Sequence, residues 1–516
     1  MSSSSSVEVE AKFRVHPPFE IPDLLDPRTG AAGLDEPIHH ELRAVYWDTT
    51  DLRLAREGIT LRHRDGEGPD KDGWHLKLPV GDVRAVPDAS AVSREEVRVA
   101  GPAETIPDEL RGLVLPWSRT AVLGPVAILV TDRTAYLLRD VAGGPLVELT
   151  DDLVSVVNSG HVAGRFREIE VEDRGGGMDS IEAVGNLLRA SGAVGGEFVP
   201  KVVRALGPQA SAEPDPPMPG KVGLDEPARC AVRDMLRRDV RRLIALDTGV
   251  RRNAEDAAHQ MRVTARRLRS ILKTFRPLLD PDWAGSLRDE LSWLADSLST
   301  TRDNEVLLDR LMRDVDSLPE DLVIGPVRAR LEQVLQGNLA IGRASVEASL
   351  SSERYVVLLE RLVDAGWEPF TSPAGERPTA KAVPRLIRAC WNDVSDGVKR
   401  LEDSEVDSRA WHKVRIDAKQ LRYSCEAAVP MFGRPAQRLA KIAAGLQDSL
   451  GENQDAAVAA ELLKSLATAR GGTTIAFTLG LLHARQSDAG ALARTQFAKQ
   501  WKSATKSDSL DWLGGA

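Results

Sequence analysis

The segment VEVEAKF at residues 7–13 alternates apolar and charged side chains without a break. Because successive side chains of a β-strand point to opposite faces, this pattern predicts a strand with Glu8, Glu10 and Lys12 on one face. Two carboxylates on one face repel each other unless a cation lies between them, and paired carboxylates are what a hard divalent metal binds. Taken alone, the segment also fits a solvated edge strand, since half-exposed strands often alternate in this way.

The same alternation returns in several later segments, which turn-rich stretches such as residues 64–73 separate. The charged residues that share a face within a segment are Arg62 with Arg64, His75 with Lys77, Arg94 with Glu96 and Arg98, and Glu168 with Glu170 and Glu172; Arg133 lies in a further segment of this kind. Several antiparallel strands, each with one charged and one apolar face, predict a closed barrel with a polar lumen. Acidic and basic side chains that face one another across the lumen would neutralise each other.

These motifs, together with YWDTT at residues 46–50 and PKVVR at residues 200–204, resemble a CYTH domain of the triphosphate tunnel metalloenzymes over residues 5–206. The resemblance implies an eight-stranded antiparallel β tunnel that binds a triphosphate with a divalent metal. His63 stands between the two arginines, where the family usually has an aliphatic residue. Since His63 points to the outer face, we expect it to affect packing and not chemistry.

The resemblance also implies a reaction, the metal-dependent hydrolysis of inorganic triphosphate or a related organic triphosphate. The cations expected to hold phosphate oxygens are Lys12, Arg62, Arg64, Lys77, Arg133 and Lys201. The carboxylates expected to ligate Mg²⁺ or Mn²⁺ are Glu8, Glu10, Glu168 and Glu170, with Glu96, Glu172 and Asp151 or Asp152 as further partners. Phosphoryl transfer needs positioning and charge neutralisation more than covalent chemistry, so we expect water as the nucleophile and leave the general base open.

A Pro-rich segment at residues 207–221 predicts an extended linker between two domains. Two or more domains suit a chain of 516 residues. The formal charge is −13 over residues 1–220 and +4 over residues 221–516. The C-terminal part can therefore attract polyanions, although its small net charge matters less than the distribution of that charge.

After the linker the apolar periodicity lengthens to about 3.6, which predicts an all-helical domain and makes the whole an α+β multidomain chain. One predicted helix, residues 259–276, carries a basic stripe without an acid: His259, Arg262, Arg266, Arg269, Lys273 and Arg276. An ordinary solvated helix interleaves Glu with Arg to relieve repulsion. The stripe therefore indicates an anionic partner.

An internal repeat accompanies this stripe. HKVRIDAKQLR at residues 412–422 aligns with residues 259–269, and residues 446–455 align with residues 294–303. This duplicated helical pattern resembles a CHAD domain over residues 222–512, a family thought to bind inorganic polyphosphate. The positions implied to bind polyphosphate are His259, Arg262, Arg266, Arg269, Lys273, His412, Arg415, Lys419 and Arg422. Neither helix has a second His or Cys one turn away, so metal binding there is not expected.

Other classes of protein fit less well. No apolar run reaches the eighteen or so residues that span a bilayer, and the N-terminus has no apolar signal region. Cys230, Cys390 and Cys425 are too scattered for a disulfide framework, so we expect a cytoplasmic protein, with association to polyphosphate granules as a further option. Without a nucleic-acid-binding signature, nucleic acid is an unexpected partner. An adenylate cyclase of the same tunnel family and a non-catalytic polyphosphate scaffold remain alternatives, and the oligomeric state stays open.

Overall fold

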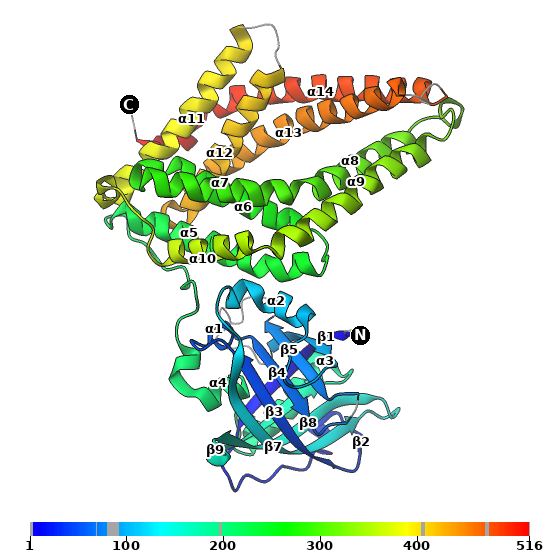
Figure 1. Ribbon diagram of the computed structural model, residues 1–516, viewed down its shortest axis with the longest axis vertical. Coiled ribbons are helices and arrows are strands. Elements are labelled where there is room, and N and C mark those ends of the chain that lie inside the picture. The colour runs from blue at the N-terminus through cyan, green and yellow to red at the C-terminus, as the bar shows by residue number, and fades with distance from the viewer. Residues whose placement is uncertain are drawn as a thin grey trace. The chain divides into compact units, whose positions relative to one another are not determined.

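The computed structural model describes residues 4–68, 70–79, 92–195, 199–403, 408–469 and 474–514. The chain divides into two compact units, Met1–Asp215 and Pro216–Ala516 (Figure 1). Strands dominate the first unit and helices the second. Among the described residues, no helix combines the length and the apolar character that a membrane crossing requires.

The first unit is an eight-stranded antiparallel barrel, which confirms the predicted fold. Its strands are β1 (Ser4–Arg14), β3 (Ile38–Asp48), β4 (Thr60–Asp65), β5 (Gly73–Pro79), β6 (Val92–Val99), β7 (Gly124–Arg139), β8 (Pro145–Asn158) and β9 (His161–Asp173). They follow the order β1-β6-β5-β4-β3-β7-β8-β9, and β9 pairs with β1 to close the barrel. Two short strands lie outside this circle: β2 (Gly33–Leu34) pairs with β7, and β10 (Val194–Gly195) pairs with β1.

Strand β1 closes the barrel by pairing with the strands on both of its sides. Its first part, from Ser4 to Glu10, pairs with β6, and its last part, from Glu10 to Arg14, pairs with β9. This register sets charged residues opposite one another on the inner face, with Glu8 opposite Arg94 and Lys12 opposite Glu170. The closure of the barrel thus brings together side chains that are distant in the sequence.

The hydrophobic core of this unit lies on the outer face of the barrel. Helix α3 (Gly177–Ala190) packs on it, and the shared buried cluster includes Phe13, Leu149, Val171 and Leu188. The other helices of this unit are α1 (Arg53–Arg56), α2 (Asp108–Ser118) and α4 (Lys201–Leu206). Val202 and Val203 of α4 are buried against apolar residues of β3 and β7, which fixes the helix beside the lumen.

The Pro-rich segment is only partly extended. Residues Gly207–Ser211 form a short 3-10 helix, contrary to the predicted extended linker, after a turn at Gly207 where φ is +74°. Glycine adopts this left-handed backbone without strain, and the following Pro208 suits the start of a helical turn. Asp215 forms an ion pair with Arg119 within the first unit. The Gly220 amide donates to Asp234 at 2.7 Å within the second unit.

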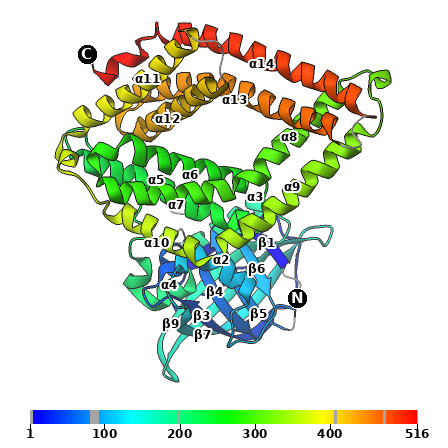
Figure 2. The same cartoon turned by 45° about the horizontal axis from the view of Figure 1, so that its top comes forward.

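The second unit is all-helical. Its helices are α5 (Ala228–Arg251), α6 (Ala257–Thr274), α7 (Pro281–Ser297), α8 (Ser299–Asp316), α9 (Val327–Leu350), α10 (Glu353–Trp367), α11 (Thr379–Asp403), α12 (Ser408–Phe432), α13 (Arg434–Thr468) and α14 (Ala476–Ala504). Helix α8 pairs with α9, and α13 pairs with α14 (Figure 2). The two pairs meet through a shared core that includes Leu331 and Leu482.

The repeated helices of the sequence are α6 and α12, and they pack against each other. The hydroxyl groups of Thr274 and Ser424 lie 2.7 Å apart in this contact, and Gln420 Nε2 donates to the carbonyl oxygen of Ser270 at 2.7 Å. A β-bridge joins Pro227 to Pro378, immediately before α5 and α11. The two halves of the repeat therefore meet through corresponding elements, α6 with α12 and the segment before α5 with the segment before α11.

Candidate functional site

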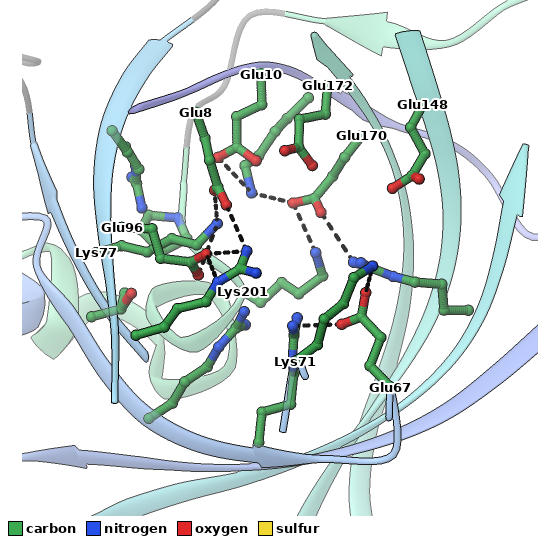
Figure 3. Close-up of a pocket in the computed structure, with 18 of the residues that line it drawn as sticks. Glu8, Glu10, Glu67, Lys71, Lys77, Glu96, Glu148, Glu170, Glu172 and Lys201 are labelled. Atoms are coloured by element: carbon green, nitrogen blue, oxygen red, sulfur yellow. Dashed lines mark hydrogen bonds and ion pairs between the residues drawn. The ribbon is translucent and has the colours of Figure 1, made fainter. Parts of the chain in front are cut away.

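The barrel lumen holds a cavity of about 230 Å³ that is lined almost entirely by charged side chains (Figure 3). The alternation of each strand points these side chains inward and the apolar ones outward. The predicted site residues that line the cavity are Glu8, Glu10, Lys12, Arg62, Arg64, Lys77, Glu96, Arg133, Glu170, Glu172 and Lys201. Residues from seven elements of the unit thus share one chamber.

Three lysines neutralise carboxylates across this chamber. Lys12 forms ion pairs with Glu170 and, at 3.4 Å, with Glu10. Lys77 forms ion pairs with Glu8 and, at 3.7 Å, with Glu96. These contacts agree with the expectation that acids and bases neutralise one another across the lumen.

Lys201 is the most heavily paired of the three. Its ammonium lies 2.8 Å from Glu168, 2.8 Å from Glu170 and 3.0 Å from Asp152. Burial alone would lower the pKa of Lys201, but these carboxylates hold that pKa well above its ordinary value. The residue therefore remains a cation inside the lumen.

The arginines differ in their partners. Arg133 donates to both oxygens of Asp152, at 2.7 Å and 2.6 Å, in the forked geometry that fixes a guanidinium in place. Arg62 donates to the hydroxyl of Tyr46 at 3.1 Å. Burial and the neighbouring Arg62 lower the pKa of Arg64 to about 10, which indicates a local excess of positive charge.

Carboxylates gather on the opposite side of the chamber from Lys71 and Glu67, where Figure 3 shows Glu8, Glu10 and Glu172 together. Burial and the charge of Glu8 raise the pKa of Glu172 to about 7. Such crowded oxygen donors have the chemistry of a Mg²⁺ or Mn²⁺ site. In the described part of the chain, however, no three acidic, His or Cys side chains already converge as metal ligands.

Three predicted metal partners, Asp151, Asp152 and Glu168, do not line the cavity. Asp151 lies on the outer face of β8, where it accepts from Arg167 at 2.8 Å and 2.7 Å, so its prediction as a metal partner is wrong. The alternation of the strand turns its neighbour Asp152 inward. Asp152 and Glu168 lie behind the cavity wall, where they hold Arg133 and Lys201. His63 faces outward as predicted, edge-on to Trp74 and 3.1 Å from the carbonyl oxygen of Gly101.

Sequence reasoning missed part of the lining. The additional residues with polar side chains are Tyr46, Thr60, Glu67, Lys71, Arg94, Arg98, Glu148 and Arg174. The alternation of their strand already predicts that Arg94 and Arg98 share a charged face with Glu96, although it assigns them no role at the site. Glu67 and Lys71 come from the turn between β4 and β5, where no periodicity shows the direction of a side chain. His75 faces inward too, and its Nδ1 lies 3.0 Å from Glu96.

The helical unit gathers four of the predicted polyphosphate-binding cations. Burial and the charges of Arg415, Arg266 and Arg262 lower the pKa of Lys419 to about 7. Burial and Arg262 likewise lower the pKa of Arg266 to about 10. These shifts agree with the packing of α6 against α12, which brings cations of the two helices close together. Asp303 and Asp455, which occupy equivalent positions in the repeat, lie near these cations. Asp303 forms an ion pair with Arg262 at 2.6 Å, and the charge of Asp455 partly offsets the lowering of the Lys419 pKa.

The other predicted polyphosphate-binding residues have separate surroundings. Arg422 donates to Glu426 at 2.7 Å on its own helix. Lys273 lines a different cavity, of about 600 Å³, with Arg276 and Cys390. His412 is exposed and has Nδ1 3.3 Å from Gln454, whereas His259 and Arg269 are half-buried on α6. The continuous stripe of the sequence is therefore divided among several environments.

Comparison with known families matches both units. The CYTH domain model matches residues 6–189, and the CHAD domain model matches residues 234–464. The protein Rv2226 of Mycobacterium tuberculosis is 32% identical over 510 residues, which cover 95% of this chain and 94% of Rv2226.

Two solved structures are similar in part. PptA from Streptomyces chartreusis is 24% identical with a TM-score of 0.47, covering 54% of this chain and 99% of PptA. The CHAD domain from the plant Ricinus communis is 24% identical with a TM-score of 0.43, covering 55% of this chain and 95% of that domain. The two matched family models and the full-length relative lead to one conclusion: the chain belongs to the two-domain proteins that join a CYTH domain to a CHAD domain.

Proposed function

We propose that the β tunnel is the active site of a metal-dependent hydrolase that cleaves inorganic triphosphate or a related organic triphosphate. The observation that carries this proposal is the chamber inside the barrel, in which cations and carboxylates face one another around about 230 Å³ of space. A phosphate chain carries dense negative charge and needs many fixed cations at once. The lumen provides such a set on rigid strands.

The cations would hold the phosphate oxygens. Lys12, Lys77 and Arg133 are each held by carboxylates, so they are oriented before a substrate arrives. Donors fixed in this way stabilise developing charge without reorganising during the reaction. Asp152 and Glu168 are positioning residues in this scheme, because they contact the cations from behind the cavity wall.

The carboxylates Glu8, Glu10 and Glu172 would hold Mg²⁺ or Mn²⁺, with Glu96 and Glu170 as neighbours. When bound, the ion supplies charge neutralisation for the phosphate oxygens and orients the substrate. The raised pKa of Glu172 supports this role, since burial and the nearby charge of Glu8 both disfavour a further unpaired carboxylate there. A bound cation would relieve that repulsion.

The helical unit would bind inorganic polyphosphate through the cluster of Arg262, Arg266, Arg415 and Lys419. Its support is the packing of α6 against α12, together with the lowered pKa values of Arg266 and Lys419, which burial and the neighbouring cations Arg262 and Arg415 cause. Binding of polyphosphate there would place the chain near cytoplasmic polyphosphate granules. The domain limits that go with these roles are residues 5–206 and 222–512.

Product analysis tests the proposal against its alternatives. The purified protein is incubated with Mg²⁺ or Mn²⁺ and, separately, triphosphate, thiamine triphosphate and ATP, while orthophosphate, pyrophosphate and cyclic AMP are followed. Orthophosphate release supports the hydrolase, cyclic AMP indicates the adenylate cyclase, and no product at all indicates a non-catalytic scaffold.

A matched pair of variants locates the activity. Glu10→Gln should abolish metal-dependent turnover, because an amide keeps the shape of the side chain but is a weaker ligand for a hard cation. Glu95→Gln is the control, since Glu95 lies on the same barrel but its side chain faces outward beside Ser5. Equal activity of both variants would exclude Glu10 from the metal site.

A further inference from the structure

We propose that Glu67 acts as an internal substitute for a phosphate group, occupying a phosphate position in the substrate-free tunnel and competing with the substrate for it. This inference rests on the proposed function of the tunnel. Glu67 lines the chamber but comes from the turn between β4 and β5, whereas the other acidic side chains of the lining come from strands. A carboxylate on a turn can leave the chamber without opening the barrel.

The contacts of Glu67 are those that a phosphate would make. Its carboxylate oxygens lie 2.5 Å from Arg64 Nη2 and 2.9 Å from Lys71 Nζ, and the side chain is only 8% exposed. Arg64, Lys71 and Arg133 outweigh the effect of burial and lower the pKa of Glu67 to about 2. Glu67 is therefore a fixed anion among the cations of the lumen.

Glu67 fills this position incompletely. Although its Oε2 lies 2.5 Å from Arg64, this buried oxygen makes no hydrogen bond of acceptable geometry within the described chain. The buried Nε of Arg64 likewise has no hydrogen-bond partner among the described residues. Buried polar atoms without partners are rare and costly. A phosphate has more oxygens and more charge than a carboxylate, so it could satisfy the forked guanidinium better.

The position of Glu67 in the chamber separates it from the proposed metal ligands. Figure 3 shows Glu67 and Lys71 on the opposite side of the chamber from Glu10 and Glu172. The negative charge of Glu67 thus interacts with Arg64 and Lys71, and Arg133 is close enough to stabilise it too. A triphosphate that extends from the metal side toward Arg64 must displace it. Glu67 would lower the affinity for every phosphate chain that reaches this far.

The alternative is that Glu67 only stabilises its turn. The main-chain amide of Glu67, and not its side chain, donates to Asp72 at 2.9 Å, so Glu67→Gln keeps this turn contact. The matched control is Asp65→Asn. Asp65 lies at the end of β4 beside the turn, but its side chain is 52% exposed and lies 3.4 Å from the outward-facing His63.

The experiment measures triphosphate binding to the full chain by calorimetry without divalent metal, so that no turnover is required. Glu67→Gln should bind triphosphate about tenfold more tightly than the unchanged protein, because the competing charge is gone. Asp65→Asn should bind as the unchanged protein does. Glu67→Asp, with a carboxylate one methylene shorter, provides a second test and should also bind more tightly.

Two outcomes overturn the inference. Equal or weaker binding by both Glu67 variants would show that Glu67 does not compete, and a lower melting temperature with unchanged affinity would assign it to the turn alone. The proposed hydrolysis fails separately, if the unchanged protein binds triphosphate but releases no orthophosphate with Mg²⁺ or Mn²⁺. Absence of metal-free triphosphate binding by all variants would overturn the inference about Glu67, whereas orthophosphate release with Mg²⁺ or Mn²⁺ would still decide the proposed hydrolysis.

Discussion

The ammonium of Lys201 lies 2.8 Å from a carboxylate oxygen of Glu168, although the two residues come from α4 and β9. Glu170 and Asp152 lie within 3.0 Å of the same ammonium. One lysine from a short helix outside the barrel therefore contacts three buried acids at once.

Replacing Lys201 by methionine should destabilise the β unit by about 3–5 kcal/mol, because removing one member of a buried ion-pair network leaves uncompensated charge. Calorimetric melting of the full chain measures this, and Lys221→Met, at an exposed position, is the control. Adding Glu168→Gln to Lys201→Met should recover part of the loss. No recovery would mean that the effect of Lys201 comes from packing rather than from charge.

Polyphosphate binding should depend on the cluster at α6 and α12. Arg266→Gln with Arg415→Gln should weaken binding about tenfold or more and reduce its salt dependence, by analogy with counterion release from nucleic acids. A suitable control neutralises Arg330 and Arg343, which are exposed on α9. Arg354 would be a less suitable residue for this control, because it forms an ion pair with Glu290 at 2.7 Å and its loss would break that contact. Equal loss in both double variants would exclude the cluster as the binding surface.

Polyphosphate binding should also weaken as the pH rises above 7. The polyanion binds the protonated form of Lys419, whose pKa is about 7 in the free protein, so binding takes up a proton above that pH. Affinity should then fall by up to about tenfold per pH unit, until the pKa of the complex is reached. Lys419→Arg, which stays charged, should bind with a shallower pH dependence. An identical pH profile for this variant would remove Lys419 from the site.

Limited trypsin digestion should cut first after Lys221. This residue is exposed, whereas Pro214, Pro216 and Pro217 are buried. Exposed segments between compact units are the usual sites of proteolysis. Mass spectrometry should find two fragments, and orthophosphate release should remain with the N-terminal one. Activity that needs both fragments would show that the site is not confined to the barrel.

The barrel was predictable because its strands alternate so regularly between charged and apolar residues. The direction of two adjacent acids could not be predicted in the same way. Asp151 and Asp152 are adjacent, and only the register of β8 decides which of them faces the lumen. Glu67 and Lys71 follow no period, so no pattern in the sequence indicates that their turn folds into the chamber. On α6, the spacing predicted one basic stripe. The packing of neighbouring helices decides that Arg262 meets Asp303 while Lys273 lines another cavity.

The split pairing of β1 has a consequence for synthesis of the chain. Strand β1, Ser4–Arg14, leaves the ribosome before the other strands of this barrel, but it completes its hydrogen bonds only when His161–Asp173 has emerged. Contacts between such distant segments form slowly, because a long loop must close before they contribute. Until then, the end of β1 that awaits β9 exposes an unpaired edge, and the charges of Glu10 and Lys12 on that edge oppose its pairing with other chains.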